Sequence, residues 1–327
     1  MGALVTSWPR EAAELFGRAV VCEYASLTRD GRPVTWPMAP YTGAGGTLDV
    51  STGLTYPDKA ERARRNPRVA LLYSSAEGVG PGRAPVVLVQ GRATVRDADL
   101  QAGTDRYVRE SLAANAGGMA GMPWFLLKRL GWYFARIWVE VTPERIVWWP
   151  EGDLSGPPEE WAHPGEPVVP PSDPAPKGPR LPSRSAPPAD WRPFADRAAR
   201  LGEPVVTMVA DGRPLPVRAR AAVRTGTGFN LRLPAGIEAA DGPVCLTFHR
   251  YGPALAWQEN MVLVGTATGD GDRLSVRVER ALNDWSLPRG GARFRSFLGE
   301  GRKLRNRLRA EAARRGQPVP VVRRPRT

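Results

Sequence analysis

The sequence predicts a mainly β protein: two consecutive β-barrels with flanking helices. Two observations support this fold class. Apolar and polar residues alternate along short segments bounded by Gly, Pro, Asn or Asp, which is the pattern of antiparallel strands and not of alternating strands and helices. A hairpin turn of sequence Asp-Gly-Arg-Pro also occurs twice, at residues 30–33 and 211–214, which lie 181 residues apart.

The first half of the chain contains six to seven predicted antiparallel strands. A tract at the end of this half, 133–149, is broken by Thr142-Pro143-Glu144-Arg145, so it is either one long strand or a hairpin. Helical spacing and end signals place short helices between some of the strands. The predicted strands are 19–27, 33–41, 47–51, 68–73, 84–95 and 133–149, and the predicted helices are 9–16, 57–66 and 98–112.

Two further matches follow the repeated turn in the same order. Residues 48–53 resemble 231–236, and residues 87–94 resemble 262–268. Three ordered matches indicate an internal duplication. Between the copies, prolines crowd residues 150–188 and the apolar periodicity disappears, which is typical of a surface linker or a wrapping arm. The predicted organisation is a first barrel at 1–149, a Pro-rich linker at 150–189, a second, degenerate barrel at 190–288 and a basic C-terminal helix and tail at 289–327.

The positive charge belongs to the tail. Residues 289–327 hold thirteen Arg or Lys and two Glu, a net charge of +11, so the rest of the chain carries only +2 of the total +13. Cys22 and Cys245 lie far apart within apolar runs, which predicts buried free thiols and a reducing, cytoplasmic location. The N-terminus lacks a signal-peptide pattern and no 18 apolar residues are consecutive, so we expect no membrane partner.

One segment predicts an anion site. The helix at 57–66 follows a strand that ends in Ser51 and Thr52, and its Lys59 and Arg62 are three residues apart and share a face. Two cations, two hydroxyls and the N–H groups of a helix start favour a phosphate. The alternative is a solvated basic face. The corresponding segment of the second copy, 237–242, has two acidic residues and no Lys or Arg, so we expect one such site per chain.

Residues 10–150 contain five motifs that follow one another in a fixed order. The set resembles the pyridoxamine 5′-phosphate oxidase-like, flavin-binding split-barrel superfamily. In the second copy only the hairpin and strand pieces remain. The resemblance implies two tandem split barrels that form an intrachain pseudo-dimer, with the flavin at their interface. The motifs lie at residues 28–37, 50–53, 59–71, 90–93 and 141–145.

The resemblance also implies which residues hold the cofactor, FMN or alternatively the deazaflavin coenzyme. Lys59 and Arg62 match the residues that hold its phosphate, and Ser51 and Thr52 match positions that bond the phosphate or the ring edge. The strand from Thr35 to Met38 would flank the ring. Trp257 and Gln258 are candidates for a wall from the second barrel, because an aromatic face covers a ring and an amide reads its polar edge. The expected cofactor-binding residues are Thr35, Trp36, Pro37, Met38, Ser51, Thr52, Lys59, Arg62, Gln90, Trp257 and Gln258.

The function implied by the resemblance is that of a flavin-dependent oxidoreductase. It would transfer hydride between the bound flavin and a small organic substrate, and since the flavin performs that chemistry, no catalytic side chain is assigned. Three alternatives stay open: a non-catalytic flavin- or ligand-binding protein, a nucleic-acid-binding protein that uses the basic tail, and a heme protein with His249 as ligand. Metal-ligand spacing is absent. We expect a monomer with an internal pseudo-dimer, or a homo-oligomer.

Overall fold

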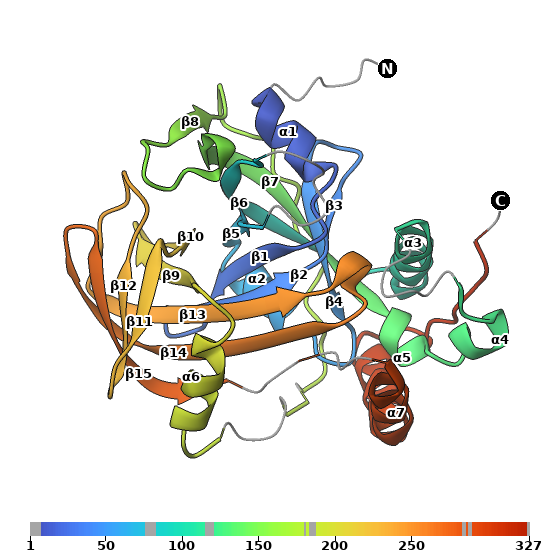
Figure 1. Cartoon of the computed structure of the whole chain (residues 1–327). Helices are drawn as coiled ribbons and strands as arrows, with labels where there is room; N and C mark the ends of the chain where they lie inside the picture. Colours follow the sequence, from blue (N-terminus) through green and yellow to red (C-terminus); the bar gives the residue numbers. More distant parts are fainter. Residues whose placement is uncertain are drawn as a thin grey trace.

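The computed structural model describes residues 8–75, 83–114, 121–179, 181–182, 188–282, 286 and 290–325, with backbone alone at 254 and 290–300. Within these residues the chain forms two curled antiparallel sheets, one from each half of the sequence (Figure 1). Each sheet has seven strands in its main path, and one extra strand pairs with the first sheet. The predicted mainly β fold of two tandem split barrels is confirmed.

The two sheets share one topology, which confirms the duplication. The described strands of the first sheet are ordered β2 (Pro33–Met38), β1 (Cys22–Leu27), β5 (Arg68–Tyr73), β6 (Val86–Arg96), β7 (Arg136–Trp149), β4 (Leu48–Gly53) and β3 (Pro40–Thr42), with β8 (Glu159–Ala162) beside β7. The second sheet is ordered β10 (Arg213–Arg218), β9 (Val205–Ala210), β13 (Gly242–Tyr251), β14 (Gln258–Asp270), β15 (Arg273–Ala281), β12 (Gly228–Arg232) and β11 (Ala221–Arg224). Strand for strand, the connectivity is the same.

A β-bulge marks the same position in both sheets. The register of β6 and β7 shifts between Gln90 and Gly91, and that of β14 and β15 shifts between Val264 and Gly265. The tract at 142–145 therefore forms a bulge inside one long strand and no hairpin turn. Counted from the bulges, Val50 corresponds to Leu231, so the sequence match of 48–53 with 231–236 is wrong by two residues.

The outer face of the first sheet packs directly on the second sheet. Alternate residues of β1, β5, β6 and β7 belong to one buried cluster with residues of the second sheet, whose strand β10 packs on β1, β5 and β6. The other faces of the same first-sheet strands line a separate core inside the first barrel. Period-two alternation thus supplies two apolar faces, because each strand is covered on both sides. The first-sheet members of the shared core are Ala25, Ala70, Leu72, Val86, Leu88, Val147 and Trp149.

Helices cover the ends and one side of the first barrel (Figure 1). The described helices are α1 (Arg10–Phe16), α2 (Asp58–Arg65), α3 (Leu100–Ala113), α4 (Trp124–Leu127), α5 (Gly131–Phe134), α6 (Arg192–Ala199) and α7 (Gly290–Arg314), with single 3₁₀ turns at Pro150–Gly152 and Pro253–Leu255. α7 lies beside α5, and its Leu304, Leu308 and Ala312 enter the first-barrel core. α2 has no counterpart between β12 and β13, as the sequence predicted. Among the described helices, none has the length and hydropathy needed to span a membrane.

We expect Gly91→Ala to destabilise the first barrel. A Cβ at residue 91 would lie 2.3 Å from the carbonyl oxygen of Thr142 in the bulge, and backbone cannot move aside cheaply. Overpacking of this kind costs about 1–3 kcal/mol, to be measured as a fall in the free energy of unfolding in urea. Gly45→Ala is the matched control, since a Cβ there meets nothing within 4 Å. Equal stability of the two variants would contradict the bulge constraint.

Candidate functional site

Helix α2 presents three different sides to its surroundings. Ala60 and Ala63 are buried in the first-barrel core and fix the helix on the sheet. Lys59 and Arg62 flank this apolar stripe on one side, and Glu61 and Arg64 flank it on the other, because successive helical residues are 100° apart. Pro57 occupies the N-cap position, one residue before the place expected from the sequence, and provides no side-chain cap.

The Lys59 and Arg62 side of α2 faces the edge of the first sheet. The ammonium nitrogen of Lys59 lies 5.2 Å from the ring centroid of Trp36 on β2. Arg62 Nε donates a 3.0 Å hydrogen bond to the hydroxyl of Ser26 on β1. Trp36 lies opposite Tyr24 in the β1–β2 register, so both face the same side of the sheet as Ser26. Two cations, a hydroxyl and an indole ring therefore converge at this edge.

The second barrel supplies a wall to the same place. Trp36 packs against Cys245 on β13 and against Val262 and Val264 on β14. Burial raises the pKa of the Cys245 thiol to about 11, and the positive charge of Arg62 opposes that rise. The Tyr24 hydroxyl is buried and has no hydrogen-bond partner among the described residues. Its pKa is raised by burial, again opposed by Arg62. The Arg62 charge thus acts on groups of both barrels.

Thr35 and Gln90 join the two barrels. The hydroxyl of Thr35 shares a 2.5 Å hydrogen bond with the hydroxyl of Thr207, and its carbonyl accepts from Thr247 at 3.1 Å. Gln90 donates to the carbonyl of Pro214 and accepts from Arg145. The Thr35 side chain faces the second barrel, while that of the adjacent Trp36 faces α2. Thr35 and Gln90, both predicted to bind the cofactor, therefore lie in the interface between the two barrels.

The remaining predicted residues of the first barrel point in different directions. Thr52 is buried and donates to the carbonyl of Tyr56, at the turn that leads into α2. Ser51 lies on the other face of β4 from Thr52 and pairs with Trp138 of β7. The indole N–H of Trp138 donates to the carbonyl of Gly103 in α3. Met38 packs on the first-barrel core. Pro37 pairs with Glu23 in the β1–β2 register and so faces the second barrel.

Trp257 and Gln258 lie at the start of β14 in the second barrel. Trp257 lines a pocket together with residues of α6. Gln258 is buried and lies opposite Tyr251 in the β13–β14 register. The structure therefore brings Trp36, Lys59 and Arg62 together, and places Trp257 in a different pocket.

A buried polar contact joins the barrels near this edge. His249 Nε2 of β13 lies 2.7 Å from Glu23 Oε1 of β1, and the Ser74 hydroxyl donates to the same oxygen at 2.6 Å. The side chains of His249 and Glu23 are 4% and 1% exposed. One of the two ring nitrogens of His249, Nε2, is thus engaged with Glu23. No group of three or more potential metal ligands occurs among the described residues.

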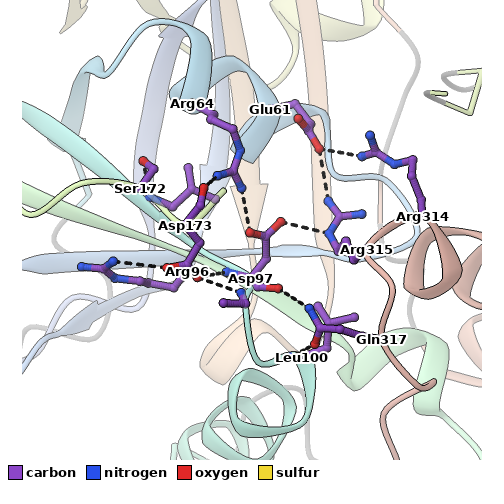
Figure 2. A network of polar contacts seen from close by, with 12 residues as sticks. Glu61, Arg64, Arg96, Asp97, Leu100, Ser172, Asp173, Arg314, Arg315 and Gln317 are labelled. Atoms are coloured by element: carbon purple, nitrogen blue, oxygen red, sulfur yellow. Dashed lines mark hydrogen bonds and ion pairs between the residues drawn. The ribbon is translucent and has the colours of Figure 1, made fainter. Parts of the chain in front are cut away.

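The other side of α2 belongs to a buried ion cluster, formed by Glu61, Arg64, Asp97, Glu311, Arg314 and Arg315. Figure 2 shows these residues except Glu311. Asp97 accepts from Arg64 at 2.7 Å and from Arg315 at 2.9 Å, and its side chain is 2% exposed. Three carboxylates balance three guanidiniums, so the cluster is neutral. It fixes the end of α7 to α2 and to the end of β6.

The Pro-rich arm and the C-terminal segment close over this cluster. The Asp173 carboxylate accepts from the backbone N–H groups of Asp97 and Ala98, and Gln317 bonds both Asp97 and Leu100 (Figure 2). Arg307 of α7 donates to the carbonyl of Thr55 at 2.9 Å, and its guanidinium lies 4.3 Å from the ring centroid of Tyr56. The turn before α2 is thereby held from outside the barrel.

These contacts divide the charge of the C-terminal helix. Arg314 and Arg315 are neutralised in the ion cluster, and Arg307 is bound at the α2 turn. The exposed basic side chains of the described part of α7 are Arg302, Lys303, Arg305 and Arg309. α7 packs on the first barrel through Leu304, Leu308 and Ala312. The basic face available to a nucleic acid is smaller than the charge of the tail implies.

Sequence reasoning missed the partners of Lys59 and Arg62. Ser26, Tyr24 and Cys245 lie in ordinary strand alternation, and nothing in their spacing connects them to the helix. One signal was present: positions 24 and 26 share a face in any strand over 22–27. Which helix covers that face depends on how the sheet curls, and the sequence does not state it.

Comparison with known proteins gave matches among solved structures only; no protein-family model and no curated protein matches the chain. Solved structures similar to this one come from the flavin-binding split-barrel family. A pyridoxamine 5′-phosphate oxidase-related, FMN-binding protein from Nostoc punctiforme is 14% identical and covers 45% of this chain and 85% of its own, at a TM-score of 0.32. A protein of the pyridoxinephosphate oxidase family from Clostridium acetobutylicum is 14% identical over 46% of this chain and 92% of its own, at a TM-score of 0.31.

A third similar structure is named for a different cargo. HutZ, a heme storage protein from Vibrio cholerae, is 14% identical and covers 41% of this chain and 88% of its own, at a TM-score of 0.29. The names of the first two structures match the superfamily that the sequence motifs resemble. At these identities and TM-scores the similarity transfers no activity, and the function of this chain is argued from its own residues.

We expect both cysteines to resist an aromatic disulfide reagent in the folded protein. Cys22 and Cys245 are fully buried, and burial raises the pKa of both thiols, so the reactive thiolate is scarce at pH 7–8. Both should react when urea is added. Rapid labelling of the native protein at Cys245 would show that the wall beside Trp36 opens to solvent.

We expect Asp97→Asn to loosen α7 from α2. The change leaves two buried guanidiniums without their shared carboxylate, and breaking a buried ion pair costs about 3–5 kcal/mol. Limited proteolysis should then cut α7 faster, and the free energy of unfolding should fall. Glu14→Ala removes an exposed i,i+4 pair and serves as control. Unchanged proteolysis of the Asp97→Asn variant would contradict the role of the cluster.

Proposed function

We propose that this protein is a flavin-dependent oxidoreductase with a single cofactor site per chain. The observation that carries the proposal is the convergence of Lys59 and Arg62 on the Trp36 edge of the first sheet, against a wall from the second barrel. The site would take the phosphate of FMN or of the deazaflavin coenzyme. The second barrel has no helix equivalent to α2, which limits the chain to one such site.

The residues at this edge fit a phosphate-bearing cofactor. A phosphate needs cationic and hydroxyl donors, and Lys59, Arg62 and Ser26 are of those kinds. The buried Tyr24 hydroxyl, which has no partner within the described part of the chain, is a further polar atom beside Arg62. Thr35 and Gln90 already bond the second barrel, so we assign them to holding the interface. Ser51 faces α3, and we leave it outside the phosphate site.

The chain's own groups would bind and orient the cofactor. A bound flavin supplies hydride transfer to or from a small organic substrate. Lys59 and Arg62 would balance the phosphate charge, and the Nε–Ser26 hydrogen bond holds the Arg62 guanidinium in place. Cys245, Val262 and Val264 exclude water from the side of Trp36 that faces the second barrel. The Arg307 contacts and the ion cluster hold α2 against the first barrel.

A protein that binds the flavin without catalysis is the second candidate. It is favoured by the kind of residue at this edge, because Lys59, Arg62 and Ser26 are groups that bind a phosphate and none of them is assigned a catalytic role. The two candidates predict the same cofactor spectrum. They differ in whether the loaded protein is reduced by a nicotinamide or deazaflavin donor and reoxidised by an acceptor. Turnover supports the oxidoreductase, and a spectrum that no donor changes supports the binding protein.

We expect Lys59→Glu to abolish flavin binding. The change places a carboxylate where the phosphate charge would be balanced, so the protein should purify without the visible absorption of a flavin and should not take up FMN or the deazaflavin coenzyme in titration. Lys128→Glu, a charge reversal at an exposed residue of the same barrel, is the control. A wild-type protein that takes up neither cofactor would overturn the proposal, and so would normal uptake by the Lys59→Glu variant.

A further inference from the structure

The second barrel carries a basic pocket on the side of β13 and β14 that faces α6. Its volume is about 250 Å³. It is lined by three arginines, one glutamate, one leucine and one tryptophan: Arg197, Arg200, Arg250, Glu259, Leu201 and Trp257. α6 and the segment just after it supply one side. The β13–β14 hairpin supplies the other. Nothing in the proposed cofactor site uses these residues.

The pocket lies on the far side of the β13–β14 hairpin from the first barrel. Arg250 and Glu259 are opposite one another in the β13–β14 register, and so are their neighbours His249 and Asn260. Successive strand residues face opposite sides, and His249 contacts Glu23 of the first barrel. Arg250 and Glu259 therefore face away from that barrel. The pocket is separate from the Lys59 and Arg62 site.

Contacts among neighbouring residues hold two of the pocket's side chains, Arg197 and Trp257, in place. Arg197 Nε donates to Glu259 Oε1 at 2.7 Å, which fixes one guanidinium. A Cβ on Gly252 would lie 2.2 Å from Trp257 Nε1 and 2.6 Å from its Cδ1, so the indole lies directly on the Gly252 backbone. The φ of Gly252 is −94°, a value open to any residue, so the indole is what requires glycine there. One face of Trp257 is thus supported by backbone.

The charges of the lining match a dianion. Three arginines and one glutamate give a net charge of +2. A phosphate monoester carries about −1.5 to −2 at pH 7 and accepts several guanidinium hydrogen bonds. The C-terminus of α6 favours cations and accounts for Arg197 and Arg200. It does not account for Arg250 on β13 or for the supported tryptophan beside it.

We propose that this pocket binds a small phosphate monoester with a planar ring, of mononucleotide size. Arg200 and Arg250 bind the phosphate, and Trp257 stacks on the ring. Aromatic stacking of this kind tolerates different bases, so the pocket selects the class and not one base. The space of about 250 Å³ is large enough for one ring and one phosphate. Such a ligand would occupy the chain in addition to the flavin.

The test is calorimetric titration of the full-length protein with adenosine 5′-monophosphate, adenosine and inorganic phosphate. We expect the monophosphate to bind at one site per chain, with an affinity that falls as salt is raised. Arg250→Glu and Arg200→Glu, both at exposed residues, should each weaken it by about tenfold or more. Gly252→Ala should displace the indole and weaken the monophosphate while leaving phosphate affinity within about twofold. Trp257→Ala provides the same readout without the added Cβ.

Two variants locate the binding. Arg273→Glu, at an exposed residue of β15 in the same barrel, should leave the affinity unchanged. Lys59→Glu should also leave it unchanged, because α2 lies in the other barrel. Absence of monophosphate binding to the wild-type protein would overturn the proposal. Full affinity in the Arg250→Glu variant, or its loss in the Lys59→Glu variant, would overturn it as well.

Discussion

The structure depends on the packing of the two curled sheets against each other. Neither half-barrel could leave its outer face exposed, because the residues there include Leu72, Leu88 and Trp149. Each large apolar side chain buried in this core is worth about 1.5–3 kcal/mol, against about 0–1 kcal/mol for an exposed ion pair such as Arg32 with Glu279. Apolar burial therefore holds the barrels together. The hydrogen bonds of Thr35, Gln90 and Glu23 fix the position of one barrel against the other.

Within that frame the two copies have taken different parts. The first copy has a helix, α2, after its fourth strand. α7 and the Pro-rich arm hold this helix through the ion cluster and Arg307. The second copy has no helix at the corresponding position, and α6 packs against its β13–β14 hairpin. The common sheet topology shows a shared origin for the scaffold. Lys59 and Arg250 lie at positions that do not correspond between the two copies, so the two copies carry their charge in different places.

Much of the fold could be read from the sequence because its signals are local. The Asp-Gly turns at 30–31 and 211–212 adopt positive φ at Gly31 and at both Asp211 and Gly212, which hairpins require. Strand alternation located β1, β5 and β6 to within a few residues. The Pro-containing tract at 142–145 was ambiguous, since a bulge and a turn both interrupt alternation. Only the pairing with Gly91 decides between them.

The candidate site was predictable only in part. The sequence by itself determined that Lys59 and Arg62 share a helical face and that the second copy lacks that helix, because helical period and composition are properties of the chain. It also indicated the internal duplication through three matches in the same order. Tertiary structure alone decided that Ser26, Trp36 and Cys245 lie near those cations. It also decided that the Thr35 hydroxyl bonds to Thr207 and that Trp257 lines a pocket on the second barrel. Those outcomes depend on which faces approach one another between elements that lie apart in the chain, by 36 residues for Ser26 and Arg62 and by 172 for Thr35 and Thr207. No local pattern encodes that approach.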